Sequence, residues 1–342
     1  MTAMRATKSR AVAFVATVVL VLLGFGGTAH ADPAGPTDYQ TEILSIDPPT
    51  PSITLSVIGG DSFIQLKASP EADVVVLGYF AEPYLRFRSG GEVQENRNSP
   101  TTYQNEERYG ADAPEFATPD ADADWVTVAD DGTYAWHDHR AHWMQPIRPA
   151  GKAPGDRIVE QVIPIVVDGD EVDVTVISTW QSEPSLVPAV AGVAIGGLVV
   201  AGAAWLSRRT PTWPVALLPV AAIAAIAGWW QYLSLPSETG PRLIWPLLPS
   251  IAVVASASAG LLGRRSPFAA VAAGLVAGSQ LAIWAFVKRD GLTAAIVPTD
   301  APQWFERLAL TSAFTVGVGA LVIAGVQLFS GSLGTKQVAA AT

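Results

Sequence analysis

The sequence predicts two parts: an all-β domain of the antiparallel, immunoglobulin-like β-sandwich type over residues 32–184, then an α-helical membrane bundle of about five helices over residues 185–330. Three observations predict this division. Short runs that alternate apolar and polar residues fill the first part, and apolar blocks of membrane length fill the second. The mean hydropathy is +0.30. Only 15% of the residues are charged, whereas globular domains average about 25%.

Residues 1–31 have the pattern of a secretory signal peptide. Three basic residues precede an apolar run over residues 11–26, and Ala29-His30-Ala31 fits the small-residue rule for cleavage after Ala31. Two alternatives stay open. Cleavage after Ala29 would leave His30 at the mature N-terminus, where an amine and an imidazole chelate Cu(II) as in exported copper-binding domains of the CopC type. Without cleavage, the apolar run would stay as a membrane anchor.

The two parts carry opposite charge. Residues 32–184 contain 27 acidic and 9 basic residues, whereas the rest of the chain is net basic and the whole chain has a net charge of −10. We expect no nucleic-acid partner, because affinity for nucleic acids depends on cations that neutralise phosphates. The chain contains no Cys, which excludes disulfides, zinc fingers and thiol nucleophiles.

The expected strands of the first part are short and separated by turn signals. Gly59-Gly60-Asp61, Ser89-Gly90-Gly91 and Asp168-Gly169-Asp170 each mark a reversal of the chain. The acidic interval over residues 110–124 has no periodicity and predicts a long loop. We expect strands at Glu42–Ile46, Ile53–Val57, Phe63–Lys67, Val74–Phe80, Tyr84–Arg88, Trp125–Val128, Ile158–Val167 and Val172–Trp180.

The second part predicts a multi-pass protein of the cell membrane, with the lipid bilayer as its first partner. Its blocks are Val187–Leu206, Trp213–Leu233, Leu243–Leu262, Pro267–Val287 and Leu308–Phe329. Arg208-Arg209 and Arg264-Arg265 lie in short loops, which the positive-inside rule places in the cytoplasm. The β domain is then extracytoplasmic and the tail over residues 331–342 is cytoplasmic. Lys288-Arg289 would lie on the extracytoplasmic side in this orientation, which is against the rule, but nearby acidic residues offset their positive charge.

The five blocks contain no Asp, Glu, Lys, Arg or His. Ionisable residues in a bilayer usually mark ion paths or cofactor sites, so their absence favours an anchor over a transporter. Gly192-x-x-x-Gly196 and Gly274-x-x-x-Gly278 allow helices to approach closely, either within the chain or as a dimer face.

A cluster of His and Met predicts a metal site. After removal of the signal peptide the chain holds three His and one Met, and all four lie between His137 and Met144. Imidazole is a common ligand of copper and zinc, and a thioether favours Cu(I). We therefore expect His137, His139, His142 and Met144 to bind metal, copper first and zinc second, with Asp138 as a ligand or as the partner of an imidazole.

Geometry limits this expectation. If Tyr134–His142 is a strand, His137 and His139 point to one face and His142 and Met144 to the other, so His142 or Met144 joins only through a bend after Arg140. Arg140 adds a permanent cation, which disfavours a metal unless its side chain points away. The alternative is a hydrogen-bonded structural network beneath the two Trp residues that flank the cluster.

Other sequence patterns give weaker evidence for a calcium site or for enzymatic activity. Asp120, Asp122, Asp124 and Asp131 have a calcium-loop spacing, but the position that needs Gly holds Trp125. The chain has no nucleophile elbow, no H-E-x-x-H motif and no nucleotide loop, so we expect no enzymatic activity.

Three stretches carry a resemblance to a known family. They are Glu82-Pro83-Tyr84-Leu85-Arg86, then Asn96-Arg97-Asn98-Ser99-Pro100 with Tyr103-Gln104-Asn105 and Arg108-Tyr109-Gly110, and Trp136-His137-Asp138-His139-Arg140 with His142-Trp143-Met144. Together they resemble an uncharacterised family of actinobacterial exported membrane proteins. The resemblance implies a signal peptide, a β-rich ectodomain and C-terminal transmembrane helices, and it implies no activity.

Two functions follow as hypotheses. The first is a membrane-anchored extracytoplasmic binding protein that uses the His/Met cluster to bind copper for sensing, buffering or delivery to an envelope partner. The alternative is a structural or interaction domain, without metal, that anchors or assembles with an envelope membrane complex.

Overall fold

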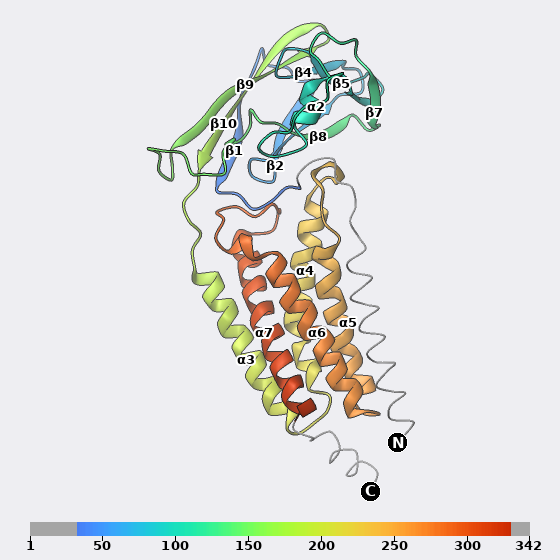
Figure 1. The fold of residues 1–342 in the computed structure, drawn as a ribbon, viewed down its shortest axis with the longest axis vertical. Helices are drawn as coiled ribbons and strands as arrows, with labels where there is room; N and C mark the ends of the chain where they lie inside the picture. Colours follow the sequence, from blue (N-terminus) through green and yellow to red (C-terminus); the bar gives the residue numbers. More distant parts are fainter. Residues whose placement is uncertain (1–32, 330–342) are drawn as a thin grey trace.

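The structure is a computed structural model that describes residues 33–329. A β domain sits on one end of a bundle of long helices (Figure 1). The predicted signal peptide, with its alternative cleavage positions, and the predicted tail over residues 331–342 lie outside the described residues and stay predictions.

Ten strands form two open antiparallel sheets. The larger sheet has the order β1-β10-β9-β4-β5-β6-β7 and the smaller one has the order β2-β3-β8. The strands are β1 (Tyr39–Asp47), β2 (Ile53–Ile58), β3 (Phe63–Ala68), β4 (Val74–Leu77), β5 (Pro83–Phe87), β6 (Val93–Asn96), β7 (Trp125–Ala129), β8 (Thr133–His137), β9 (Arg157–Val167) and β10 (Asp170–Trp180). The antiparallel β region is thus confirmed, whereas immunoglobulin-like topology is not shown by this strand order.

One hydrophobic core joins the two sheets. Ile64 and Leu66 of β3 pack in it with Val74 and Val76 of β4, and all four are buried. Every second residue of these strands faces the core, as the alternation in the sequence predicts. The β9–β10 hairpin turns at Asp168 (φ 53°) and Gly169 (φ 96°), where two positive φ angles match the right-handed twist of the strands.

Two elements of the domain have no counterpart in the prediction. Strand β6 is the mostly polar sequence Val93–Asn96, and helix α2 (Pro100–Gln104) has only five residues. Both are held by neighbours rather than by periodicity: β6 pairs with β5 and β7, and the Ser99 side chain caps α2. A third difference is that β8 ends at His137, so no strand extends to His142.

Within residues 33–329, five helices are long and apolar enough to cross a membrane, which indicates a multi-pass membrane protein in a lipid bilayer. They are α3 (Val187–Ser207), α4 (Leu218–Ser234), α5 (Ile244–Leu262), α6 (Pro267–Val287) and α7 (Gln303–Phe329), joined in part by the 3₁₀ turns η1 (Trp213–Leu217), η2 (Ser237–Thr239) and η3 (Arg289–Leu292). Helix α7 begins before the predicted Leu308. It therefore includes Glu306 and Arg307, which are buried within the bundle.

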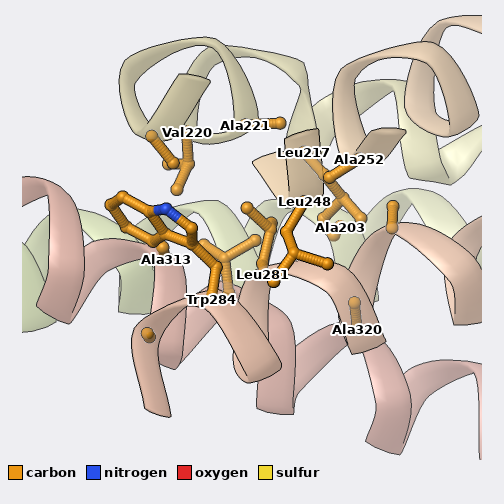
Figure 2. Close-up of a cluster of buried hydrophobic side chains, with 14 of the residues drawn as sticks. Ala203, Leu217, Val220, Ala221, Leu248, Ala252, Leu281, Trp284, Ala313 and Ala320 are labelled. Carbon is orange, nitrogen blue, oxygen red and sulfur yellow. The ribbon is translucent and has the colours of Figure 1, made fainter. Parts of the chain in front are cut away.

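Small residues set the spacing of the helices. A Cβ atom added at Gly192 would meet the carbonyl oxygen of Leu308 at 2.5 Å, and one added at Gly196 would meet that of Ser312 at 3.0 Å. The Gly192-x-x-x-Gly196 face is thus occupied by α7 of the same chain rather than open for a dimer. Figure 2 shows the bundle interior, where Leu and Trp side chains interleave with Ala203, Ala221, Ala252, Ala313 and Ala320.

The β domain and the bundle are joined by backbone hydrogen bonds and an apolar contact. Thr37 pairs with Ile296 as an isolated bridge, and the Ala34 N–H donates to the carbonyl of Thr239 at 3.0 Å. Phe63 of β3 packs in a small cluster with Trp245 of α5. Because Phe63 is paired with His137 across β3 and β8, the histidine end of the domain faces the bundle.

Candidate metal centre

The candidate site lies where β8 ends. His137 is the last residue of the strand, and the chain then turns back, with the Ala141 N–H donating to the Asp138 carbonyl at 2.9 Å. This turn brings His142 to the same side as His137 and His139. One ring nitrogen from each imidazole lies within 4.8 Å of the others. No strand runs over Tyr134–His142, and the bend that His142 requires begins at Asp138, directly after β8, rather than after Arg140.

The three rings pack against one another. His137 and His142 stack with centroids 4.7 Å apart, and His139 stands nearly perpendicular to both. His137 and His142 are buried, whereas His139 is partly exposed.

Backbone carbonyls fix one nitrogen of every ring. His137 Nδ1 lies 3.1 Å from the Asn105 oxygen, His139 Nε2 lies 3.0 Å from the Glu107 oxygen, and His142 Nδ1 lies 3.0 Å from the Trp143 oxygen. A carbonyl only accepts, so each of these nitrogens carries the proton and donates.

The second nitrogen of each ring is left with a lone pair. These atoms are Nε2 of His137, Nδ1 of His139 and Nε2 of His142. His142 Nε2 is buried and has no hydrogen-bond partner among the described residues. Imidazoles that donate from one nitrogen to a carbonyl and keep the other free have the arrangement of metal ligands.

Burial keeps the imidazoles neutral. Desolvation, with a smaller contribution from His139, lowers the pKa of His137 to about 4. Desolvation, with a contribution from His137, lowers the pKa of His142 to about 2. The pKa of His139 is lowered as well, chiefly by desolvation. Since metal ions bind the neutral imidazole, protons do not compete for these three rings near neutral pH.

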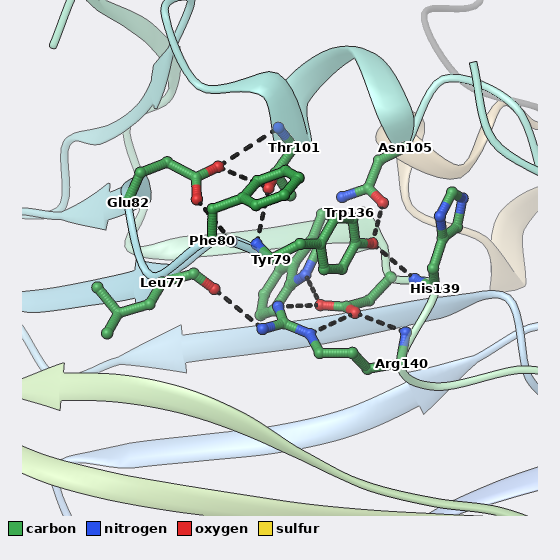
Figure 3. A network of polar contacts seen from close by, with 10 residues as sticks. Leu77, Tyr79, Phe80, Glu82, Thr101, Asn105, Trp136, His139 and Arg140 are labelled. Atoms are coloured by element: carbon green, nitrogen blue, oxygen red, sulfur yellow. Dashed lines mark hydrogen bonds and ion pairs between the residues drawn. The ribbon is translucent and has the colours of Figure 1, made fainter. Parts of the chain in front are cut away.

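Asp138 and Arg140 form an ion pair of their own, and Figure 3 shows Arg140 with its hydrogen bonds near His139. Arg140 Nε donates to Asp138 Oδ1 at 2.9 Å and Nη2 donates to Oδ2 at 2.8 Å, and Trp136 Nε1 donates to Oδ2 at 2.9 Å. Asp138 is not in the group of residues that could jointly hold an ion. The Arg140 guanidinium points to this carboxylate and to the Leu77 carbonyl. Its positive charge is therefore neutralised by Asp138 and does not oppose a metal ion at the histidines.

Tyr79 and Asn105 connect this pair to the imidazoles. The Tyr79 hydroxyl donates to Asn105 Oδ1 and accepts from the His139 N–H at 2.8 Å, while its ring stacks on His139. Arg140 lies 5.0 Å from the Tyr79 ring centroid. The turn that carries His139 is thus held from both sides (Figure 3).

Several supporting residues were beyond sequence reasoning. Asn105 and Glu107 act through their backbone carbonyls, which any residue type would supply. Asn105 lies in one of the stretches that carry the family resemblance, which is the one sequence signal that could have found it, and Glu107 lies in none of them. Met144 is partly buried two residues after His142, and its role as a ligand stays a prediction.

A cavity of ≈ 570 Å³ opens beside the site, between the domain and the helix ends. His137 and Arg108 line it from the domain, and Arg242 lines it from the segment before α5. Arg108 is paired with the buried Asp61 at 2.5 Å. The three histidines are the one group of this kind found within residues 33–329, so the acidic calcium-type spacing at Asp120–Asp131 is not gathered into a site there.

Comparisons of the chain with family models, with curated proteins and with solved structures give no match. The resemblance noted from the sequence therefore rests on its motifs alone.

Proposed function

We propose that this chain is a membrane-anchored extracytoplasmic metal-binding protein that takes one copper ion through His137, His139 and His142. The observation that supports this most is the matched set of ring nitrogens. Each imidazole is held by a carbonyl at one nitrogen, which leaves the other with a lone pair, and one ring nitrogen of each lies within 4.8 Å of the others.

The ligand set favours copper over zinc. Imidazole sites bind Cu(II) more strongly than Zn(II) in the order of first-row divalent ions. Nitrogens about 2 Å from one ion lie about 3.4 Å apart, so the ring nitrogens must approach one another by up to about 1.4 Å from their present limit of 4.8 Å. Three protein ligands leave a position for a fourth, which Met144 or a small molecule takes.

The position of the site fits sensing, buffering or delivery in the cell envelope. The Arg208-Arg209 and Arg264-Arg265 loops lie at the end of the bundle opposite the β domain (Figure 1), which supports an extracytoplasmic domain by the positive-inside rule. The cavity that His137 lines gives an ion a route that does not require the β core to open.

The direct test is metal uptake by the full chain in detergent. After dialysis against Cu(II), bound metal is measured by elemental analysis, with Zn(II) as the competing ion. We expect about one copper per chain, and loss of uptake in the variant H137A/H139A/H142A. The control D120N/D122N/D124N removes three acids from the exposed loop and keeps full uptake. Equal uptake by the wild type and the histidine variant would contradict the site.

A structural domain without metal is the second candidate, and the burial and stacking of His137 and His142 favour it. In this alternative the histidines support a domain that assembles with an envelope membrane protein. It predicts that the triple variant loses thermal stability, while copper leaves the melting temperature of the wild type unchanged. The metal hypothesis predicts that copper raises that temperature, because an ion that binds only the folded state stabilises it.

A further inference from the structure

A second polar site lies inside the bundle, at the helix ends that face the β domain. A cavity of ≈ 200 Å³ is enclosed by Gln231 of α4, Trp245 of α5, Lys288 after α6 and Glu306 of α7, and the segment Pro33–Pro36 covers it. None of these residues belongs to the histidine cluster, although Pro33, Gly35 and Pro36 also line the cavity beside His137.

A buried ion pair forms one wall. Lys288 Nζ lies 2.7 Å from Glu306 Oε2, and the two side chains are 6% and 2% exposed. Lys288 Nζ also lies 4.8 Å from the centroid of Trp284. The pair explains why Lys288 departs from the positive-inside pattern: its charge is neutralised within the bundle and is not a free loop charge. Buried ionisable groups in membrane proteins usually mark a functional site.

Two acceptors in this wall have no donor. Glu306 Oε1 and Gln231 Oε1 are buried, and neither has a hydrogen-bond partner among the described residues. Gln231 is 3% exposed and Glu306 is 1% exposed. An acceptor buried without a donor is costly, and both residues border the same cavity. These two acceptors are therefore left for a donor that a ligand in the cavity would bring.

The charges at the cavity have both signs. Arg242 and Asp290 line it together with the ion pair. Arg242 is exposed, and no carboxylate among the described residues pairs with it. A guanidinium of this kind suits a phosphate, whereas the orphan oxygens and the Trp245 ring suit an ammonium group. The helix ends also lie where lipid headgroups border a bilayer.

We propose that this cavity binds a primary ammonium group that carries a phosphate, the chemistry of a phosphoethanolamine. The ammonium donates to Gln231 Oε1 and Glu306 Oε1, and the phosphate lies toward Arg242. Either a phosphatidylethanolamine headgroup or free phosphoethanolamine has this chemistry.

The test compares two ligands that differ only in their donors. The full chain in detergent is titrated with short-chain phosphatidylethanolamine and with the matching phosphatidylcholine, whose trimethylated nitrogen has no N–H, and binding is followed by native mass spectrometry. We expect the ethanolamine lipid to bind about tenfold more tightly, because its ammonium makes two hydrogen bonds that the choline cannot. Equal affinities would overturn the proposal and leave a water-filled cavity.

A matched pair of variants locates the effect. Q231M removes one orphan acceptor and should bring the two lipids to within about threefold of each other. Gln280 of α6 is equally buried and also has an orphan Oε1, but it does not border the cavity. The control Q280M should therefore keep the preference. A preference that survives Q231M would overturn the assignment to this cavity.

Free phosphoethanolamine serves as the competing ligand. Displacement of the lipid by it identifies a soluble zwitterion as sufficient, and failure to displace identifies a lipid. The comparison of the two wild-type titrations stands even where a variant does not fold. Copper uptake is measured on the same samples, so that failure of one site is distinguished from failure of the other.

Discussion

The β domain and the helical bundle bury polar groups in different ways. In the domain, most buried polar side chains belong to networks, such as Glu82 with Ser99 and Thr101 or Asp138 with Arg140 and Trp136. In the bundle, orphan atoms occur on Gln231, Ser256, Gln280, Glu306 and Arg307. Among the described residues, the domain also leaves Asn105 Nδ2, His142 Nε2 and Ser178 Oγ unpaired, but its buried carboxylates and Arg140 are held in networks, whereas Glu306 and Arg307 of the bundle each keep one atom without a partner. The hydrogen-bond networks of the domain fix the orientation of its buried polar side chains. In the bundle, close packing of small residues sets the distances between helices.

The comparison predicts that the domain is most sensitive to the loss of a buried charge. D138N leaves the Arg140 guanidinium buried without its partner. We expect a loss of about 3–5 kcal/mol in the free energy of unfolding, measured by thermal and denaturant unfolding of the full chain followed by near-UV circular dichroism. The exposed pair Arg157–Glu160 gives the control R157A, which should cost about 0.5 kcal/mol or less. Equal losses in the two variants would contradict the network.

The second-largest effect is expected from acid, which should lower the stability of the metal-free β domain. The pKa of His137 is about 4 in the folded chain and about 6.5 when unfolded. Between these values the unfolded chain binds a proton that the folded chain does not, so stability falls as pH drops from about 7 to about 4. His137 alone contributes a loss of about 3 kcal/mol. Denaturant midpoints measured across this range check it, and H137Q should flatten the curve.

The bundle should respond to volume instead of charge. In G192L the new side chain would meet the backbone of α7, and we expect a loss of about 2 kcal/mol and a lower temperature of aggregation in detergent. Gly197 lies on the same helix with nothing within 4 Å of an added Cβ. G197L is therefore the control and should behave as the wild type does. If G192L had the same stability and aggregation temperature as the wild type, the close contact between α3 and α7 would be contradicted.

The smallest effect is expected at Met144. M144L keeps an apolar side chain of similar volume, so stability should change by less than about 1.5 kcal/mol. Cu(II) uptake should stay near that of the wild type, because three imidazoles supply the binding. A selective loss of Cu(I) affinity would add the thioether to the ligand set. Loss of Cu(II) as large as in the histidine variant would show that three imidazoles are insufficient.

Periodicity predicted most of the fold. The long strands β9 and β10 and the five helices follow hydrophobic alternation or length, which are local properties of the chain. Strand β6 and helix α2 are too short or too polar for either signal, and tertiary neighbours hold them. The start of α7 was misplaced because Glu306 reads as a loop charge until Lys288, from another helix, neutralises it.

Residue type predicted part of the candidate site. The three histidines were found because their clustering is visible in the sequence. Their convergence was not, because it depends on a turn at Asp138 that follows a strand of alternating faces. The carbonyls of Asn105 and Glu107 carry no signal from residue type, because every residue has a backbone carbonyl.

Phe63 lies at the contact between the β domain and the helical bundle, so separating the two parts would uncover its side chain. Its ring packs against His137 on one side and belongs to the cluster with Trp245 of the bundle on the other. A β domain released by a protease near residue 184 would present this ring to water and lose the bridge from Thr37 to Ile296. Such a fragment would be prone to self-association through the uncovered patch, so the shed domain is a poor substitute for the anchored one.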